Sequence, residues 1–448
     1  SGDLHLLELI GIHVGGVGAS ARFVLPSMDE RTFDLTLTGL AYGGEALGRL
    51  PSEGGGPERV VFVPFGLPGE RVRVRLVEQH RGFARARLLE VLEASPQRIA
   101  PRCRHFGLCG GCHYQHMPYD LQLRAKTDIL RDQFQRIGHI PHPPVLPAVG
   151  CPEPWRYRNH VQFHLTPGGR PGYVAAFPDP QTERSGGLPV LPISECHLPE
   201  AAIDGLWPQL EFEPGTGVQR VSIRRGAGEE LLVALESDSP ELPGLELQAG
   251  VSVVHLYGEH AAVLAGHDRL TMRVLDRDFR VSAPSLFQVN TAMAARMVTH
   301  ILDGTPAAAT VLDVFCGVGL FSAFLAPRCR RLIGIEASPS ACDDFAANLD
   351  EFDHVELYQD AAENVLPALD LRPDLALVDP PRAGLDPHSV EALLRLHPQM
   401  IAYVSCDPST LARDAARLLQ GGYRLRASTP FDLFPQTYHI ESITWFDA

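Results

Sequence analysis

Apolar and polar residues alternate with a period of two along the first part of the chain, from about Phe33 to Glu93. Such a period puts successive side chains on opposite faces of a β-strand. Arg71, Arg73 and Arg75 alternate with valines, so one strand face carries guanidinium groups. We therefore predict a small OB-like β-barrel with a basic outer face over residues 31–93. Barrels of this shape commonly hold RNA, and a solvated polar face that binds nothing is the alternative.

The next part of the chain, residues 94–280, mixes two kinds of pattern. A cysteine-rich stretch precedes a helical stretch, residues 119–138, which ends at a glycine suited to a helix stop. A proline-rich linker follows, and residues 155–280 alternate short strands with Gly/Pro turns. This order predicts a mixed α+β central domain whose strands are mostly antiparallel.

Strand and helix patterns alternate regularly in the last part, residues 281–448. Regular alternation predicts a doubly wound, Rossmann-like α/β domain built on a parallel sheet. Ligands of such sheets bind outside the carboxyl ends of the strands. The whole chain is thus expected to be a multidomain protein with its chemistry in the C-terminal third.

The chain has 448 residues, of which 45% are apolar and 21% are charged, a composition typical of globular proteins. No run of 18 uncharged apolar residues occurs, so we predict no membrane span. Residues 1–27 lack the basic segment of a signal peptide, and we assign them no function. Nine cysteines without a secretory signal favour a reducing compartment, and the predicted location is the cytoplasm.

The net charge of −15 argues mildly against a nucleic-acid partner, because phosphate binding needs positive charge. The distribution of charge along the chain weakens this argument. Residues 71–104 hold nine arginines and three glutamates, so one segment is basic. Lys126 is the sole lysine, and guanidinium groups can fork onto phosphates or stack on bases. A compositional preference for arginine over lysine is an equally good explanation of this bias.

A glycine-containing turn, Asp313–Gly319, links a predicted strand to a helix. Glu336 closes the next strand, where a carboxylate can accept hydrogen bonds from both ribose hydroxyls of a nucleoside. The turn lacks the third glycine that a pyrophosphate requires. It therefore favours S-adenosylmethionine over a nicotinamide dinucleotide.

Two further strand ends carry chemistry, Asp379-Pro-Pro-Arg382 and Ser405-Cys406-Asp407-Pro408. A cysteine at a strand end is commonly a packing residue. Here it converges with an acidic group above the predicted cofactor crevice, and carbon 5 of uracil becomes nucleophilic once a thiolate adds to carbon 6. A base must then remove the carbon-5 proton, and Glu441 is the first candidate, with His439 the second.

Three cysteines lie within ten residues, at positions 103, 109 and 112. They are one ligand short of a structural zinc site or a cubane iron–sulfur cluster, and Cys151 and Cys196 are the downstream candidates for the fourth. Buried thiols without a metal are the remaining alternative.

With these residues in view, the chain resembles the bacterial RNA uracil-5-methyltransferase family, in its iron–sulfur branch. The resemblance covers residues 33–448 in eight ordered blocks: VVFVPFGLPGE of a TRAM domain, CGGCHYQH, WRYRNHVQF, FQVN, DVFCGVGLFS, VDPPRAG, YVSCDPSTLARD and FDLFPQTYHIES. It implies Cys406 as nucleophile and Glu441 as base. It also implies a [4Fe–4S] cluster bound by Cys103, Cys109, Cys112 and Cys196, with Cys151 left over. The S-adenosylmethionine contacts that it implies come from Gln288, Phe315, Glu336, Asp360 and Asp379. The chain departs from the family at Leu320, where Asn or Thr is common, so a side-chain contact to the cofactor is in doubt there.

The resemblance also implies a substrate. Family members that methylate the T-loop of tRNA typically lack both the TRAM domain and the cluster, so 23S ribosomal RNA is the expected partner and tRNA the alternative. We expect a monomer, and a cluster that shapes the RNA-binding surface without donating electrons. An RNA cytosine-5-methyltransferase is disfavoured, because that chemistry often places a cysteine where this chain has Arg382. A non-catalytic RNA-binding or assembly protein is disfavoured by the presence of Cys406 and Glu441.

Overall fold

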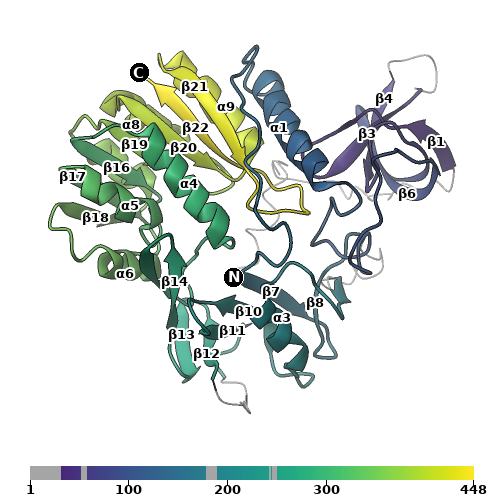
Figure 1. The fold of residues 1–448 in the computed structure, drawn as a ribbon, viewed down its shortest axis with the longest axis horizontal. Coiled ribbons are helices and arrows are strands. Elements are labelled where there is room, and N and C mark those ends of the chain that lie inside the picture. The colour runs from purple at the N-terminus through teal and green to yellow at the C-terminus, as the bar shows by residue number, and fades with distance from the viewer. Residues whose placement is uncertain (1–31, 52–57, 178–188, 242–243, 245–249) are drawn as a thin grey trace, which may run out of the picture.

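The computed structural model describes residues 32–51, 58–177, 189–241, 244 and 250–448. The N-terminal segment 1–27, to which no function was assigned, lies outside the described residues. Three large sheets succeed one another along the chain, and Figure 1 shows the first at the right, the second below and the third at the upper left. No helix in the described part of the chain is long and apolar enough to span a membrane.

The first sheet has six strands in the order β1-β5-β6-β4-β3-β2 and wraps its own core, which includes Leu35, Val61 and Val72. Alternation holds as predicted, since Val72 and Val74 are fully buried between arginines that face outward. The strands are β1 (Thr32–Thr36), β2 (Gly39–Leu40), β3 (Glu45–Leu50), β4 (Arg59–Pro64), β5 (Arg71–Gln79) and β6 (Phe83–Glu93).

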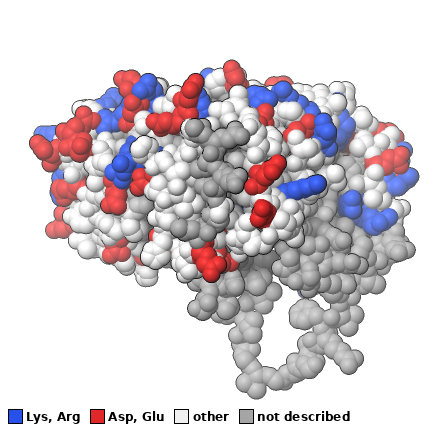
Figure 2. Space-filling view, turned by 90° about the horizontal axis from the view of Figure 1, so that it is seen from below, with Lys and Arg blue, Asp and Glu red and all other residues white. Residues whose placement is uncertain are grey.

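The outer face of this sheet is less basic than predicted. Arg71 is within 2.8 Å of Glu93 on β6, and Arg73 is within 3.0 Å of Asp34 on β1 and 3.2 Å of Glu90 on β6. The neighbouring strands thus supply carboxylates that offset the guanidinium charges, and sequence order does not reveal these neighbours. Figure 2 likewise shows basic and acidic side chains interspersed over the face in view.

The second sheet has seven strands in the order β13-β12-β11-β10-β7-β8-β9. All its neighbours are antiparallel except β11 and β12, which confirms the mostly antiparallel prediction. A separate hairpin, β14–β15, follows. The elements are α1 (Tyr119–Arg136), β7 (His160–Leu165), β8 (Pro171–Val174), β9 (Val190–Pro192), α3 (Ala201–Leu206), η1 (Trp207–Gln209), β10 (Val218–Arg225), β11 (Leu231–Ser237), β12 (Ser252–Tyr257), β13 (His260–Ala265), β14 (Arg269–Val274) and β15 (Arg277–Ser282).

The third sheet has seven strands in the order β18-β17-β16-β19-β20-β22-β21. Its first five are parallel, as predicted, whereas β22 is inserted antiparallel between β20 and β21. Apolar cores cover both faces. The elements are α4 (Thr291–Gly304), β16 (Thr310–Val314), α5 (Leu320–Leu325), η2 (Ala326–Arg328), β17 (Arg331–Glu336), α6 (Pro339–Asn348), β18 (Val355–Gln359), α7 (Ala362–Val365), η3 (Leu366–Ala368), β19 (Leu375–Val378), α8 (Pro387–Leu396), β20 (Met400–Ser405), α9 (Pro408–Gln420), β21 (Arg424–Phe431) and β22 (Glu441–Asp447).

Helix α1 and the linker after it pack on the third sheet, although they precede the second sheet in the chain. Val145 and Val149 form bridges with the edge strand β21. On α1, the buried Lys126 ammonium is 2.6 Å from the buried Asp432 carboxylate. Figure 1 shows α1 between the first sheet and the third. This segment therefore ties the N-terminal half of the chain to the edge where β21 ends.

Candidate active site and cysteine cavity

The turn after β16 is shaped by backbone that most residues avoid. Phe315, Gly317 and Gly319 have φ values of 65°, 53° and 88°, in the left-handed region. A Cβ at Gly319 would lie 2.4 Å from Leu349 Cδ1, so only glycine fits there. The Gly317 N–H donates to Glu336 Oε2 at 2.9 Å, which joins the turn to the end of β17. The two features that sequence reasoning paired thus meet at one sheet edge.

Carboxylates gather at the carboxyl ends of the parallel strands. Burial, and next the Glu336 charge, raise the pKa of Asp379 to about 7. Burial also raises the pKa of Asp313 to about 7. Asp360 differs, because it is exposed and its pKa is lowered by hydrogen bonds from Asn364 and the backbone. An edge with this charge favours a ligand that brings a cation and hydroxyl donors, as S-adenosylmethionine does.

Gln288, an expected cofactor contact, and Leu320, the departure from the family pattern, are less well connected to this edge. The Gln288 backbone carbonyl accepts from Asn159 Nδ2 at 2.9 Å, and no hydrogen bond among the described residues ties its side chain to the edge. Leu320 is 7% exposed and packs in the apolar core. A polar contact to a cofactor from that side chain is therefore absent, as the departure from the family pattern suggested.

Cys406 and Glu441 lie side by side. Strands β20 and β22 are antiparallel, with Ser405 opposite Ser442. One residue further along this register, the residue that follows β20 lies opposite the first residue of β22. Those residues are Cys406 and Glu441. Asp379, which follows the neighbouring strand β19, lies at the same edge, and its charge acts on both. The register thus brings together a thiol and two carboxyl groups from three strands.

The negative charges that Cys406, Glu441 and Asp379 can carry repel one another. Burial, then Glu441 and Asp379, raise the pKa of Cys406 to about 12, while Arg382 acts to lower it. Burial and Asp379 raise the pKa of Glu441 well above its usual value. Arg382, noted in the sequence only as part of a turn, is the cation that offsets this repulsion. The second base candidate, His439, is held neutral because burial, and then Arg382, lower its pKa to about 3.

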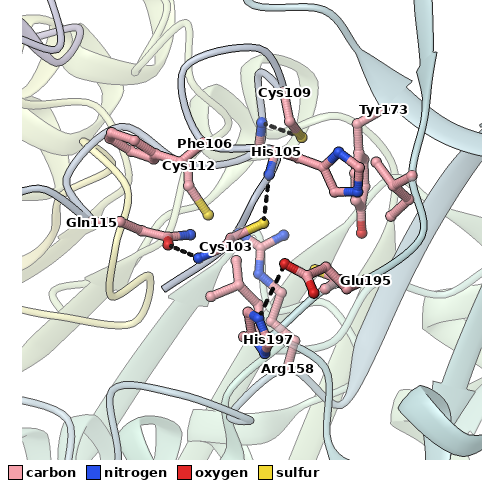
Figure 3. Close-up of a pocket in the computed structure, with 14 residues that line it drawn as sticks. Cys103, His105, Phe106, Cys109, Cys112, Gln115, Arg158, Tyr173, Glu195 and His197 are labelled. Carbon is pink, nitrogen blue, oxygen red and sulfur yellow. Dashed lines mark hydrogen bonds and ion pairs between the residues drawn. The ribbon is translucent and has the colours of Figure 1, made fainter. Parts of the chain in front are cut away.

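Four thiols line one cavity of about 30 Å³, shown in Figure 3. Three come from the loop before α1 and the fourth from the segment after β9; they are Cys103, Cys109, Cys112 and Cys196. Two backbone N–H groups point at sulfur, from His105 to Cys103 Sγ at 3.4 Å and from Gly111 to Cys109 Sγ at 3.3 Å. All nine cysteines of the chain are described and free. Cys151 lies elsewhere, with its sulfur against Asn290.

The cavity is also lined by Arg158, whose Nε donates to the Tyr157 hydroxyl at 3.3 Å. No carboxylate in the described part of the chain pairs with this guanidinium. Burial raises the pKa of Cys112 to about 12 and that of Cys109 to about 11. Within the same described ranges, no three His, Cys, Asp or Glu side chains converge closely enough to hold one metal ion. The four-cysteine cavity thus offers free thiols, amide donors to sulfur and the Arg158 guanidinium to a ligand.

The fold and the strand-end chemistry define a methyltransferase, and comparison with known proteins narrows this class. Residues 265–448 match the tRNA (uracil-5-)-methyltransferase family and residues 26–89 match the TRAM domain. An uncharacterised RNA methyltransferase of Halalkalibacterium halodurans is 33% identical over 439 residues, which cover 88% of this chain and 94% of that protein. One from Streptomyces coelicolor is 34% identical over 441 residues, with 93% of each chain covered.

A solved structure shares the fold over nearly the whole chain. The Pyrococcus abyssi tRNA (uracil-54, C5)-methyltransferase, in complex with S-adenosyl-L-homocysteine, has a TM-score of 0.68 at 22% identity, with 92% of this chain and 99% of that chain covered. The chain belongs to the RNA uracil-5-methyltransferase family and carries an N-terminal TRAM domain. The matched family and these relatives are all named for the methylation of RNA.

Proposed function

We propose that the protein methylates carbon 5 of a uridine in 23S ribosomal RNA, with Cys406 as covalent nucleophile and Glu441 as base. The observation that carries this proposal is the β20–β22 register, which sets the two side chains next to each other at the cofactor edge. A target base inside a helix must leave its stack to reach them, at a cost of a few kcal/mol that RNA contacts offset.

In the first half of the reaction, the Cys406 thiol releases its proton to solvent and the resulting thiolate adds to carbon 6 of the uracil. The carbon 5–carbon 6 double bond opens, and the electron pair is shared between carbon 5 and the carbon-4 oxygen as an enolate. Carbon 5 then takes the methyl group from the sulfonium of S-adenosylmethionine, which leaves as S-adenosylhomocysteine. Arg382 supports this half, because its charge opposes the effects that raise the pKa of Cys406.

The second half follows from the repulsion between the two side chains. The Glu441 charge raises the pKa of Cys406, and because electrostatic repulsion is mutual, the pair favours a single negative charge. While Cys406 is a thiolate, Glu441 keeps its proton. Once the sulfur is bonded to carbon 6, that charge is gone and Glu441 can release its proton to solvent. It then accepts the carbon-5 proton, and elimination returns the thiolate and the 5-methyluracil.

We assign the cofactor contacts to the strand-end residues. We assign the ribose hydroxyls to Glu336, whose carboxylate also accepts from the Gly317 N–H, and a further contact to Asp379, whose charge acts on Cys406. The other three assigned contacts are Gln288, Phe315 and Asp360.

We assign a [4Fe–4S] cluster to the four-cysteine cavity. When bound, the cluster would cross-link the cysteine loop to the segment after β9, and methyl transfer to an enolate needs no electron from it. The loop in turn holds the chain that leads to Glu441, since the N–H groups of His113 and Tyr114 both donate to the Gln436 carbonyl, at 2.9 and 3.0 Å. A rigid cysteine loop would thus help to fix the base.

The choice of 23S ribosomal RNA rests on the TRAM domain together with the four cysteines. The T-loop of tRNA is the second candidate substrate. A specific observation favours it, because the Pyrococcus abyssi enzyme named for uracil-54 of tRNA matches 92% of this chain.

The test uses RNA that contains 5-fluorouridine. Fluorine cannot leave carbon 5 as a proton does, so the methylated adduct cannot be resolved and persists. Wild-type protein and Cys406→Ala are incubated with S-adenosylmethionine and either a 23S RNA fragment or tRNA, and the products are analysed by intact-mass spectrometry. We expect an adduct with 23S RNA for the wild-type protein and none for Cys406→Ala.

Each other outcome corrects a defined part of the proposal. An adduct with tRNA alone would keep the mechanism and change the substrate. An adduct of equal yield with Cys406→Ala would refute the nucleophile. No adduct with either RNA, together with intact RNA binding, would favour a non-catalytic RNA-binding protein.

A further inference from the structure

A turn of the first sheet reaches the proposed catalytic edge. The turn joins β2 to β3, and its Tyr42 hydroxyl donates to Asp407 Oδ2 at 3.1 Å. The Tyr42 ring also meets the Tyr438 ring edge-on, with 5.7 Å between centroids. Gly44 lets the turn approach so closely, because a Cβ there would lie 3.0 Å from His113 Cβ. The TRAM domain therefore contacts both the residue after Cys406 and the segment before Glu441.

Asp407 is held from two sides. Its Oδ1 accepts the N–H groups of Ser409 and Thr410 at 2.9 and 3.0 Å and so caps helix α9. Its Oδ2 accepts the Tyr42 hydroxyl. Burial and the Asp407 charge raise the pKa of Tyr42 far above its usual range, so the phenol keeps its proton and remains a donor. The carboxylate next to Cys406 is thus anchored both by its own helix and by a distant domain.

The charge of Asp407 matters to the thiol. Four charged groups face Cys406, of which Glu441, Asp379 and Asp407 raise its pKa and Arg382 lowers it. A hydroxyl that donates to Asp407 draws part of this negative charge away from the sulfur. Arg382 and Tyr438 are the other titratable groups that face Tyr42, and neither accepts its proton in the structure.

We propose that Tyr42 of the TRAM domain is a positioning residue for the nucleophile: it fixes the Cys406–Asp407 turn and withdraws carboxylate charge from the thiolate. The inference rests on the proposed role of Cys406 and adds a catalytic contribution to a domain otherwise assigned to RNA binding. Removal of the hydroxyl leaves the ring contact with Tyr438 in place and takes away only the donor.

The experiment measures the single-turnover rate of adduct formation with 5-fluorouridine RNA for full-length wild type, Tyr42→Phe and Tyr257→Phe, between pH 6 and 9.5. Tyr257, at the end of β12, is the matched control for loss of a hydroxyl. For Tyr42→Phe we expect a rate roughly tenfold lower near neutral pH, the effect of about one pKa unit on the thiol. Both proteins stay below the pKa of the thiol over this range, so each rate rises with pH, the Tyr42→Phe profile lies about one unit to higher pH, and the RNA dissociation constant stays unchanged. Tyr257→Phe follows the wild type.

A second variant separates charge from structure. In an Asp407→Asn background the charge is already absent, so addition of Tyr42→Phe should leave the pH profile where it is. A loss of rate that persists in the Asp407→Asn background, or a weaker RNA affinity with an unchanged rate, would overturn the proposal. If the wild-type protein forms no adduct, the nucleophile assignment fails; if it does and Tyr42→Phe matches it, only the role of Tyr42 fails.

Discussion

The buried ion pair between Lys126 and Asp432 holds α1 against the segment that leads to Glu441. Its side chains are 1% and 0% exposed, and Lys126 Nζ also donates to the Phe434 carbonyl at 3.1 Å. Lys126→Met removes the cation and leaves a desolvated carboxylate, which costs about 3–5 kcal/mol. At roughly 2–4 °C per kcal/mol for a unit of this size, calorimetry should show a melting temperature lower by about 6–20 °C.

Two further variants determine whether the buried charge is the cause. Arg124→Met removes a cation from the same helix, but its pair with Asp120 is exposed on both sides, so we expect a loss below about 1 kcal/mol. Lys126→Met combined with Asp432→Leu removes the lone charge and should recover most of the stability. If Lys126→Met and Arg124→Met had the same melting temperature, the reasoning would be refuted, because Asp432 would then have to be in contact with water.

Three other perturbations test the proposed site. Burial raises the pKa of Glu441, so ionisation of this group destabilises the fold; the destabilisation is zero below about pH 4 and grows as pH rises towards the folded pKa. Glu441→Gln should therefore have a higher melting temperature than the wild type at pH 8 and the same melting temperature at pH 4. On RNA, Glu441→Gln should accumulate the methylated adduct that the wild type resolves. In Gly319→Ala the new methyl group would lie 2.4 Å from Leu349, so calorimetry should show S-adenosylhomocysteine binding weakened at least tenfold. Gly317→Ala has open space at its Cβ and should bear only the left-handed backbone strain of about 1–2 kcal/mol. Equal affinities of the two variants would refute the packing argument. Cys109→Ser, purified without oxygen, should lose iron and the visible absorption of the cluster, and Cys151→Ser should keep both, unless the cluster assignment is wrong.

Much of the fold could be read from local patterns. The Arg–Val alternation at 71–75 predicted a strand with one buried face, and the turn at Asp313–Gly319 predicted the approach of a strand to a helix beside Glu336. These features depend on residues close together in the sequence. The strand-and-helix alternation after residue 281 likewise predicted the five parallel strands.

Other features depend on which strands become neighbours, and sequence order does not give this. The insertion of β22 between β20 and β21 is what sets Cys406 opposite Glu441. The carboxylates beside Arg71 and Arg73 come from adjacent strands, so the predicted basic face proved mixed. Tyr42 carried no signal at all, because its partner Asp407 lies 365 residues away.

The attachment of α1 to the last sheet has a consequence for how the chain is made. Lys126 emerges from the ribosome 306 residues before its partner Asp432. At about 5–20 residues per second, the helix therefore waits roughly 15–60 seconds with its apolar side and its cation unmatched. During that time the edge strand β21, which the linker after α1 covers, does not yet exist. A nascent chain stalled before residue 424 would expose this helix, which makes it a natural binding site for chaperones and an early point of attack for proteases.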